Sequence, residues 1–182
     1  MLRRMRGGTP LLLVDPSDPT GVGVANQKVK AEIARVLASG GTVHVLGGEA
    51  AVPTTLANAL NPAGATAVDR IAGATRYETS VKIAGALGNP KNVVVARGDD
   101  GVNLTGFADA LSAGPYAANV FGGGNGAVLL SSNTTLDPMV KTYLAGATSI
   151  QAVGGPAATA TRPRLRSRPP SPARRPRAPP WA

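Results

Sequence analysis

Short, mainly apolar runs alternate along the chain with longer amphipathic segments. The runs cover 11–14, 43–46, 93–96, 127–130 and 150–153, and each is closed by Asp, Ser, Gly or Arg-Gly. Such runs are typical of parallel strands that are covered on both faces. Segments 26–38, 107–118 and 136–144 space their apolar residues as helices do, although Gly114-Pro115 is expected to bend or shorten the second. The alternation predicts a layered α/β sandwich with a mainly parallel sheet.

The chain also repeats part of its own pattern. Residues 10–52 match 126–158, each with an apolar run, a helix, a second apolar run and a Gly-Gly pair. The pairs, Gly47-Gly48 and Gly154-Gly155, lie 107 residues apart, which is about the length of a small α/β unit. A helix over 53–60 follows the first pair, whereas an Arg/Pro-rich segment follows the second. We therefore expect two copies, neither of them whole.

The formal net charge of +9 is concentrated at the two ends of the chain. Ten of the 19 Lys and Arg residues lie before residue 7 or after residue 158, so the stretch 7–158 holds nine basic and ten acidic residues and a net charge of −1. This body is not a basic nucleic-acid-binding protein. Seven prolines among residues 159–182 predict a disordered tail, and binding of nucleic acid through that tail would depend steeply on salt and disappear with its deletion.

Several classes of site lack the residues they need. The chain has no cysteine and one histidine, His44, so thiolate metal centres and a serine–histidine relay are not expected. No apolar run approaches the roughly 18 residues of a membrane-spanning helix, and the run 11–14 is too short for a secretory signal. We expect no catalytic residues, no metal site, no cofactor and no membrane partner. His44, between apolar neighbours, is expected to be a packed core residue.

Parallel strands bring the loops at their carboxyl ends to one edge of the sheet. Helices that follow these loops would offer free N–H groups and a partial positive charge to phosphate or carboxylate groups. An arginine at this edge would add a bidentate contact. The residues predicted for this edge are Arg97, Asp99, Ser131, Ser132, Asn133, Gly154 and Gly155.

Five sequence blocks in order resemble the cell-wall-binding repeat 2 family. They are RIAGATRYETSVKIA at 70–84, VVVARGD at 93–99, FADAL at 107–111, VLL at 128–130 and VGG at 153–155. The resemblance divides the chain into a basic arm at 1–7, the rear of one repeat at 8–68, a second repeat at 69–158 that lacks its last helix, and the tail at 159–182. Its blocks add to the candidate binding residues Arg70, Arg76, Tyr77, Thr79 and Asp109.

The resemblance implies a surface anchor rather than an enzyme. Members of this family are exported proteins of Gram-positive bacteria that bind anionic wall polymers, teichoic-acid-like or secondary wall polysaccharide, without a covalent link. Their repeats are Toprim-like and pack about a pseudo-threefold axis, so other repeats are expected partners. This chain departs from the pattern by lacking an export signal and the first Arg-Tyr block, by an insertion at 100–106 and by an early end. We expect a fragment of a larger anchor, frameshifted near Thr159.

Other interpretations stay open at this stage. Arg70 and Arg76 have a structural alternative, pairing with Asp69, Glu78 or Asp109. Tyr77 and Phe107 are expected to pack in the core rather than to stack on sugars. The alternative function is a Toprim-like enzyme of phosphate or nucleotide chemistry. The acidic residues are not spaced as such an enzyme would need to hold magnesium. Glu49 follows the Gly-Gly pair, Asp99 and Asp100 are adjacent, and no Asp-x-Asp motif occurs.

Overall fold

The computed structural model describes residues 10–37, 41–61, 67–99 and 107–154. The arm at 1–7, the insertion at 100–106 and the tail at 159–182 therefore lie outside the described residues. The helices are α1 (Val24–Val36), α2 (Thr54–Leu60), α3 (Arg76–Ala86), α4 (Ala108–Asn119), the 3-10 turn η1 (Phe121–Gly123) and α5 (Pro138–Ala145). The strands are β1 (Thr42–Leu46), β2 (Ala67–Ile71), β3 (Asn92–Arg97), β4 (Gly126–Ser131) and β5 (Ser149–Ala152).

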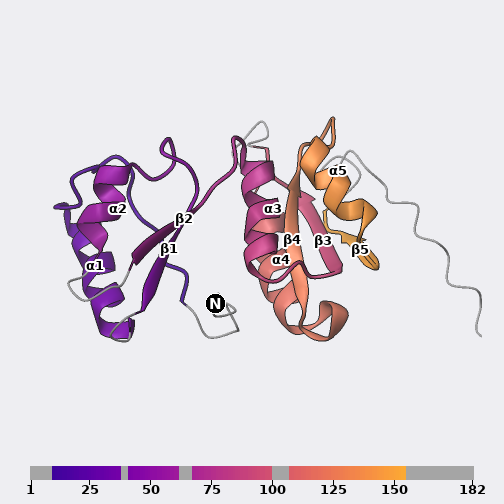
Figure 1. Ribbon diagram of the computed structural model, residues 1–182, viewed down its shortest axis with the longest axis horizontal. Helices are drawn as coiled ribbons and strands as arrows, with labels where there is room; N and C mark the ends of the chain where they lie inside the picture. The colour runs from indigo at the N-terminus through magenta and orange to yellow at the C-terminus, as the bar shows by residue number, and fades with distance from the viewer. Residues whose placement is uncertain (1–9, 38–40, 62–66, 100–106, 155–182) are drawn as a thin grey trace, which may run out of the picture.

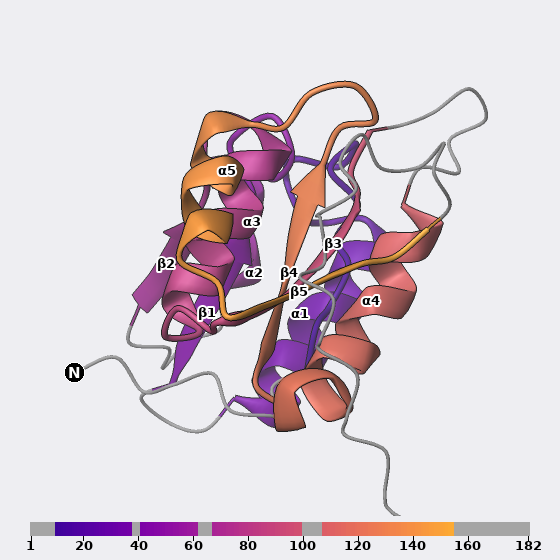
Figure 2. The same cartoon turned by 90° about the vertical axis from the view of Figure 1, so that its right-hand side faces the viewer.

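The strands form two parallel sheets (Figure 1). In the first, β1 pairs with β2 from Thr42↔Ala67 to Leu46↔Ile71. The second has the order β4-β3-β5, in which β3 lies between its two neighbours. Figure 2 shows α3 and α5 on one side of this second sheet and α4 on the other. The prediction of a layered α/β fold with parallel strands is confirmed.

Strand β3 is the centre of the core because both of its faces are covered. Val93 and Val95 point to the side of α3 and α5, where they join Leu129 and Val140 in one cluster. Val94 and Ala96 point to the other side, where they pack against Ala113 and Ala117 of α4. All four β3 residues are at most 5% exposed. This is why the segment reads as an unbroken apolar run rather than as an alternating one.

The predicted strand at 11–14 is absent, and this prediction was wrong. The segment has no strand assignment, and Leu11 and Leu13 are 74% and 84% exposed. Its counterpart in the second half, β4, is held by pairing with β3, and no described strand lies beside 11–14. The following loop is instead fixed by the buried Asn26 side chain, which accepts from the Asp15 N–H at 2.9 Å and donates to the Asp15 carbonyl at 2.9 Å.

Helix α4 has nearly the predicted extent, Ala108–Asn119 against 107–118, and Pro115 lies inside it without shortening it. Its buried face differs from the prediction. Leu111, expected on the apolar face together with Phe107, is 78% exposed. The small residues Ala113 and Ala117 form the buried face, so α4 lies close to the sheet and its packing compensates for the hydrogen bond that proline cannot donate.

Candidate functional site

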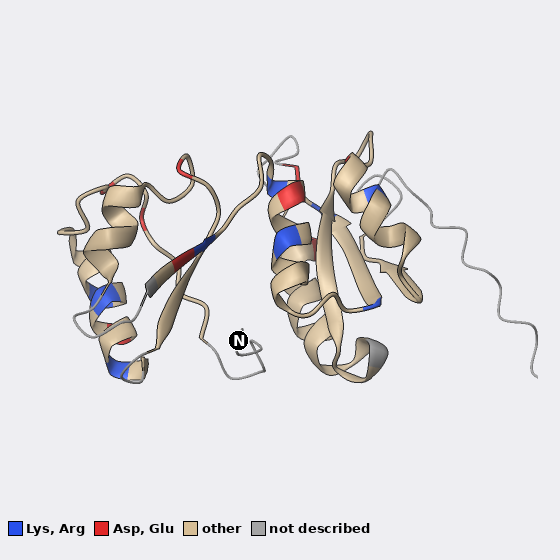
Figure 3. Cartoon of the chain, in the orientation of Figure 1, with Lys and Arg blue, Asp and Glu red and all other residues tan. Residues whose placement is uncertain are grey.

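The carboxyl ends of β3, β4 and β5 lie at one edge of the second sheet, as predicted for parallel strands. Helix α3 begins at the same edge, and Figure 3 shows basic and acidic positions adjoining at its start. The structure brings four polar residues together here, which we call the rim cluster: Arg76, Arg97, Asp99 and Asn133.

Asp99 is the central acceptor of the rim cluster. Its carboxylate accepts a hydrogen bond from Arg97 Nε, and its second oxygen accepts from the Asn133 backbone N–H at 2.8 Å. The bond from Arg97 holds the pKa of Asp99 below its usual value, and the Asn133 N–H and the charges of Arg97 and Arg76 act in the same direction. The side chains of Arg97 and Asp99 are 19% and 23% exposed, so the pair is partly shielded from water.

Arg76 supplies the second guanidinium of the rim cluster from the first turn of α3. Its Nη1 donates to the Gly98 carbonyl at 3.0 Å, and its Cζ lies 5.3 Å from the centroid of the Phe107 ring, a cation–π distance. A shallow, open depression beside it is lined by Ala74, Thr75, Arg76, Tyr77 and Asp99. The guanidinium groups of Arg76 and Arg97 thus lie at one edge with the carboxylate of Asp99, and the Glu78 carboxylate lies nearby at the Ala74 N–H.

Gly98 is a glycine because there is no room for a side chain. A Cβ at this position would lie 2.7 Å from Leu130 Cβ and 3.2 Å from Tyr77 Cε1. Its N–H donates to the Ser131 carbonyl at 2.8 Å, which ties the β3 exit to β4. Tyr77 also packs against the core cluster of β3 and β4, as predicted for a packing residue. The Arg-Gly-Asp tripeptide therefore serves this packing and the Arg97–Asp99 contact.

The serine hydroxyls predicted at this edge are used within the loop after β4. Ser131 is buried and its Oγ donates to the Ser132 carbonyl at 2.9 Å. Ser132 Oγ donates to the Thr135 carbonyl at 2.9 Å and accepts from the N–H groups of Thr134 and Thr135 at 3.2 and 3.0 Å. The two side chains shape the loop that presents the Asn133 N–H to Asp99.

Side chains cap one N–H at the start of α3 and one at the start of α5, so the N–H capped in α5 is not free as expected. Thr75 is the N-cap of α3 and accepts from the Glu78 N–H at 3.1 Å, while Glu78 Oε2 accepts from the Ala74 N–H at 2.8 Å. Asp137 caps α5 by accepting from the Met139 N–H at 2.9 Å. Sequence reasoning did not single out Thr75 and named Glu78 only as a possible ion-pair partner, although the Thr-x-x-Glu spacing is the signature of a capping box.

The remaining predicted binding residues lie outside the rim cluster. Arg70 is in β2 and its Nη1 donates to the Gly47 carbonyl at 2.7 Å, a link between β2 and β1. Thr79 Oγ1 donates to the Thr75 carbonyl and accepts from the Gly73 N–H, both at 2.9 Å. Asp109 is in the first turn of α4, and Gly154 is exposed just after β5. Gly155 lies outside the described residues.

The residues of the alternative interpretations also have defined contacts. His44 is half-buried rather than fully packed, and its Nδ1 lies 3.1 Å from Asp69 Oδ2 across the first sheet. Asp69 is thus paired with His44 and not with Arg70. Glu49 accepts from the Thr54 N–H at 2.8 Å and from the Thr54 hydroxyl, so it caps α2. Within the described ranges, no group of three His, Cys, Asp or Glu residues is arranged to hold a metal ion.

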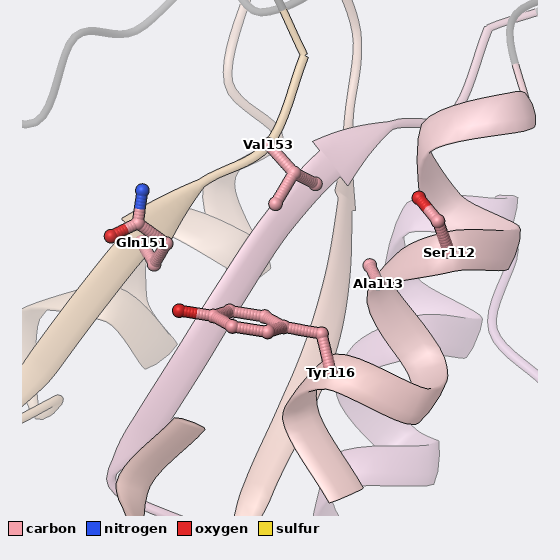
Figure 4. Close-up of a pocket in the computed structure, with 5 residues that line it drawn as sticks. All are labelled: Ser112, Ala113, Tyr116, Gln151 and Val153. Carbon is pink, nitrogen blue, oxygen red and sulfur yellow. The ribbon is translucent and has the colours of Figure 1, made fainter. Parts of the chain in front are cut away.

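A second hollow lies away from the rim, between α4 and β5 (Figure 4). Figure 4 shows Tyr116 reaching from α4 toward the side of Gln151 and Val153. The lining is a mixture of small, apolar and uncharged polar side chains: Ser112, Ala113, Tyr116, Gln151 and Val153. Such a lining lacks the charge that would attract an anionic polymer.

Among the helices that the structure describes, none is long and apolar enough to cross a membrane.

The rim cluster predicts a dependence of stability on pH. Because the pKa of Asp99 is lowered by folding, its contribution to the free energy of unfolding is present above the unfolded value near 3.8 and is lost as the pH falls through the folded value. We expect Asp99→Asn to cost roughly 1 kcal/mol near neutral pH and progressively less as the pH is lowered below 3.8. Denaturant unfolding across this range measures the difference, with Asp109→Asn as the control. A cost that stays constant with pH would contradict it.

Comparisons with known proteins place this geometry in a family. A sequence model described as Cell wall binding domain 2 (CWB2) matches residues 70–162, about half of the chain. No curated protein matches. Among solved structures, Cwp8 from Clostridium difficile is similar, with 28% sequence identity and a TM-score of 0.55 over 71% of this chain and 20% of that chain. The chain thus spans about a fifth of that protein's length. It belongs to the Cell wall binding domain 2 (CWB2) family.

Proposed function

We propose that this chain acts as a non-catalytic module that binds the anionic groups of a wall polymer, teichoic-acid-like or secondary wall polysaccharide, through the rim cluster. The observation that carries the proposal is the placement of two guanidinium groups, those of Arg76 and Arg97, at one sheet edge of a body whose overall charge is −1. Guanidinium groups gathered at one edge of a near-neutral body favour contact with spaced phosphate or carboxylate groups over general adhesion to polyanions.

The arrangement of donors suits this role. Arg76 is exposed, and Arg97 uses its Nε for Asp99. The Arg97 guanidinium has five N–H donors. Of these five, only the Nε–H donates to a residue in the described part of the chain. The Nη groups of Arg97 are therefore the donors that we assign to the polymer. Asp99 orients Arg97 and also competes with an incoming anion.

A single site of this kind binds weakly, because each charge-assisted contact is worth about 1.5–3 kcal/mol before the cost of ordering the polymer. Further repeats on the same polymer raise the effective concentration and give retention through many weak contacts. Such a mechanism fits a family of wall-associated surface proteins. We propose that other repeats of the same kind, arranged about a pseudo-threefold axis in a longer anchor, supply this multiplicity.

Sedimentation with isolated walls tests the proposal. We expect the full chain to pellet with untreated walls and to remain in solution with walls stripped of their anionic polymers. Arg97→Ala is expected to weaken pelleting about tenfold, the cost of one charge-assisted contact. Arg35→Ala is the matched control, because Arg35 is exposed, pairs with Glu32 on α1 and is far from the rim in sequence. Equal pelleting with stripped and untreated walls would reject the proposal.

In the same experiment, Asp99→Asn separates the effect of local charge from the effect of the orientation of Arg97. The change keeps an acceptor for Arg97 but removes the negative charge of Asp99, which competes with an anionic ligand for the Arg97 guanidinium. We therefore expect this variant to pellet more strongly than the parent chain, and the gain to shrink as salt is added. Weaker pelleting by Asp99→Asn at a temperature well below its Tm would show that the orientation of Arg97, and not local charge, controls binding.

A further inference from the structure

The first sheet is completed by a strand that begins the next sequence repeat. The family match starts at residue 70, yet Arg70 and Ile71 lie in β2, whose partner is β1 of the preceding repeat. The boundary between the sequence repeats therefore does not coincide with the boundary between the sheets: β2 begins the second repeat but belongs to the sheet of the first. In this arrangement a repeat gives its leading strand to the sheet of the repeat before it.

Three contacts fix β2 on the edge of β1. The Gly47 N–H donates to the Ile71 carbonyl at 3.0 Å, and Arg70 Nη1 donates back to the Gly47 carbonyl at 2.7 Å. At the middle of the register, His44 faces Asp69 with 3.1 Å between Nδ1 and Oδ2. Main-chain pairing is thus combined with side-chain contacts to Asp69 and Arg70, both of which belong to the incoming strand.

Strand β5 has the features of β1 but no described partner on its outer side. The two strands align 107 residues apart, and the glycine after each has a positive φ, 113° at Gly47 and 96° at Gly154. The Val153 N–H donates to the Val95 carbonyl of β3 at 3.0 Å. Because N–H groups alternate along a strand, those of Ala152 and Gly154 face away from β3, as the Gly47 N–H faces β2.

The hollow between α4 and β5 adds a side-chain position to this edge. Gln151 aligns with His44, the residue that contacts Asp69. Figure 4 shows the Gln151 amide at the outer side of the hollow, with its Nε2 donating to the Ala152 carbonyl at 3.0 Å. An aspartate in the place of Asp69 would lie beside this amide and accept its N–H.

We propose that the outer edge of β5 binds the leading strand of another CWB2 repeat, with the sequence type of β2, in parallel and in the register of the β1–β2 pair. The occupant is a strand with the pattern Val-Asp-Arg-Ile, whose aspartate contacts Gln151 and whose arginine donates to the Gly154 carbonyl. Binding of this kind is β-augmentation, in which main-chain hydrogen bonds give affinity and side chains give specificity. It is independent of the binding of wall polymer.

A labelled synthetic peptide with the sequence of residues 66–74, TAVDRIAGA, tests the proposal on the full chain. We expect saturable binding by fluorescence anisotropy and, at saturation, at least tenfold slower amide exchange at Ala152 and Gly154 by NMR. The same peptide with alanine in place of its arginine is expected to bind several-fold more weakly. Since a nine-residue strand binds weakly alone, the sequence is also appended after residue 182, which raises its effective concentration to about the millimolar range.

Two variants of the chain separate edge pairing from other modes of binding. Ala152→Pro removes an N–H that faces away from β3 and is expected to abolish peptide binding, whereas Ala152→Val retains the N–H and is expected to bind as the parent does. Exchange at Gly47 reports on the β1–β2 pair and is expected not to change. Unslowed exchange at Ala152 and Gly154 in the appended form, or faster exchange at Gly47 because the peptide replaces β2, would overturn the proposal.

Discussion

Replacing Leu129 with alanine is expected to lower the free energy of unfolding by about 2–5 kcal/mol. Leu129 lies in β4, is 0% exposed and packs in the cluster that joins β3 and β4 to α3 and α5. The substitution removes buried apolar atoms and leaves a cavity that the neighbouring strands cannot close, since β4 is held in register with β3. The change is a large fraction of the stability of a small domain.

Leu111→Ala is the matched control for this measurement. It deletes the same atoms from a side chain that is 78% exposed on α4, so we expect a change within about 0.5 kcal/mol. Denaturant unfolding monitored by circular dichroism gives both values. A Leu129→Ala cost as small as that of Leu111→Ala would show that the second sheet does not carry the stability of the chain, and that the core has been misplaced.

The elements that the sequence predicted correctly are those with local signals. The run 93–96 is apolar on both faces because β3 is covered by helices on both sides, and Asp137-Pro138 marks the start of α5 by a cap and a residue suited to the first helical turn. The helix over 53–60 likewise appears as α2. In each case the pattern depends only on burial or capping within the segment itself.

The errors occur where the structure depends on a partner distant in the sequence. The run 11–14 has the composition of β4 but no described strand beside it, so its leucines are exposed. Strand β2 was not predicted, because Asp69 and Arg70 interrupt its apolar residues, and it becomes a strand by pairing with β1. Neither outcome can be predicted from the segment alone, since a strand is stable only in a sheet.

The candidate site was predicted in its location but not in its contacts. Parallel strands place Arg97, Asp99 and Asn133 at one edge whatever the details of packing, so their proximity follows from the fold. That Asp99 joins Arg97 to the Asn133 N–H, and that Arg76 reaches Gly98 from α3, depends on loop geometry. The sequence therefore predicts which edge of the sheet holds the candidate site, whereas the three-dimensional contacts determine which N–H donors remain available to a ligand.

Replacing Gly73 with alanine is expected to destabilise the chain by about 3 kcal/mol, at the upper end of the range for overpacking. Gly73 lies where the chain leaves β2 and enters α3. A Cβ there would lie 2.3 Å from Glu78 Cβ, 2.7 Å from the Glu78 carbonyl carbon and 2.8 Å from the Thr79 N. Two of these are backbone atoms of a helix, so they cannot turn aside as the end of a flexible side chain can.

The strain is expected to open the start of α3, because Gly73 is also bound there. Its N–H donates to Thr79 Oγ1 at 2.9 Å, and moving it away from the helix breaks that bond. Gly85→Ala is the matched control: Gly85 lies inside the same helix, the nearest atom to its added Cβ is Asn89 Oδ1 at 3.8 Å, and helix propensity favours alanine by about 1 kcal/mol. The two variants should therefore change the free energy of unfolding in opposite directions. If both stabilise the chain, Gly73 does not make the close approach that positions Arg76, and the geometry assigned to the rim cluster fails with it.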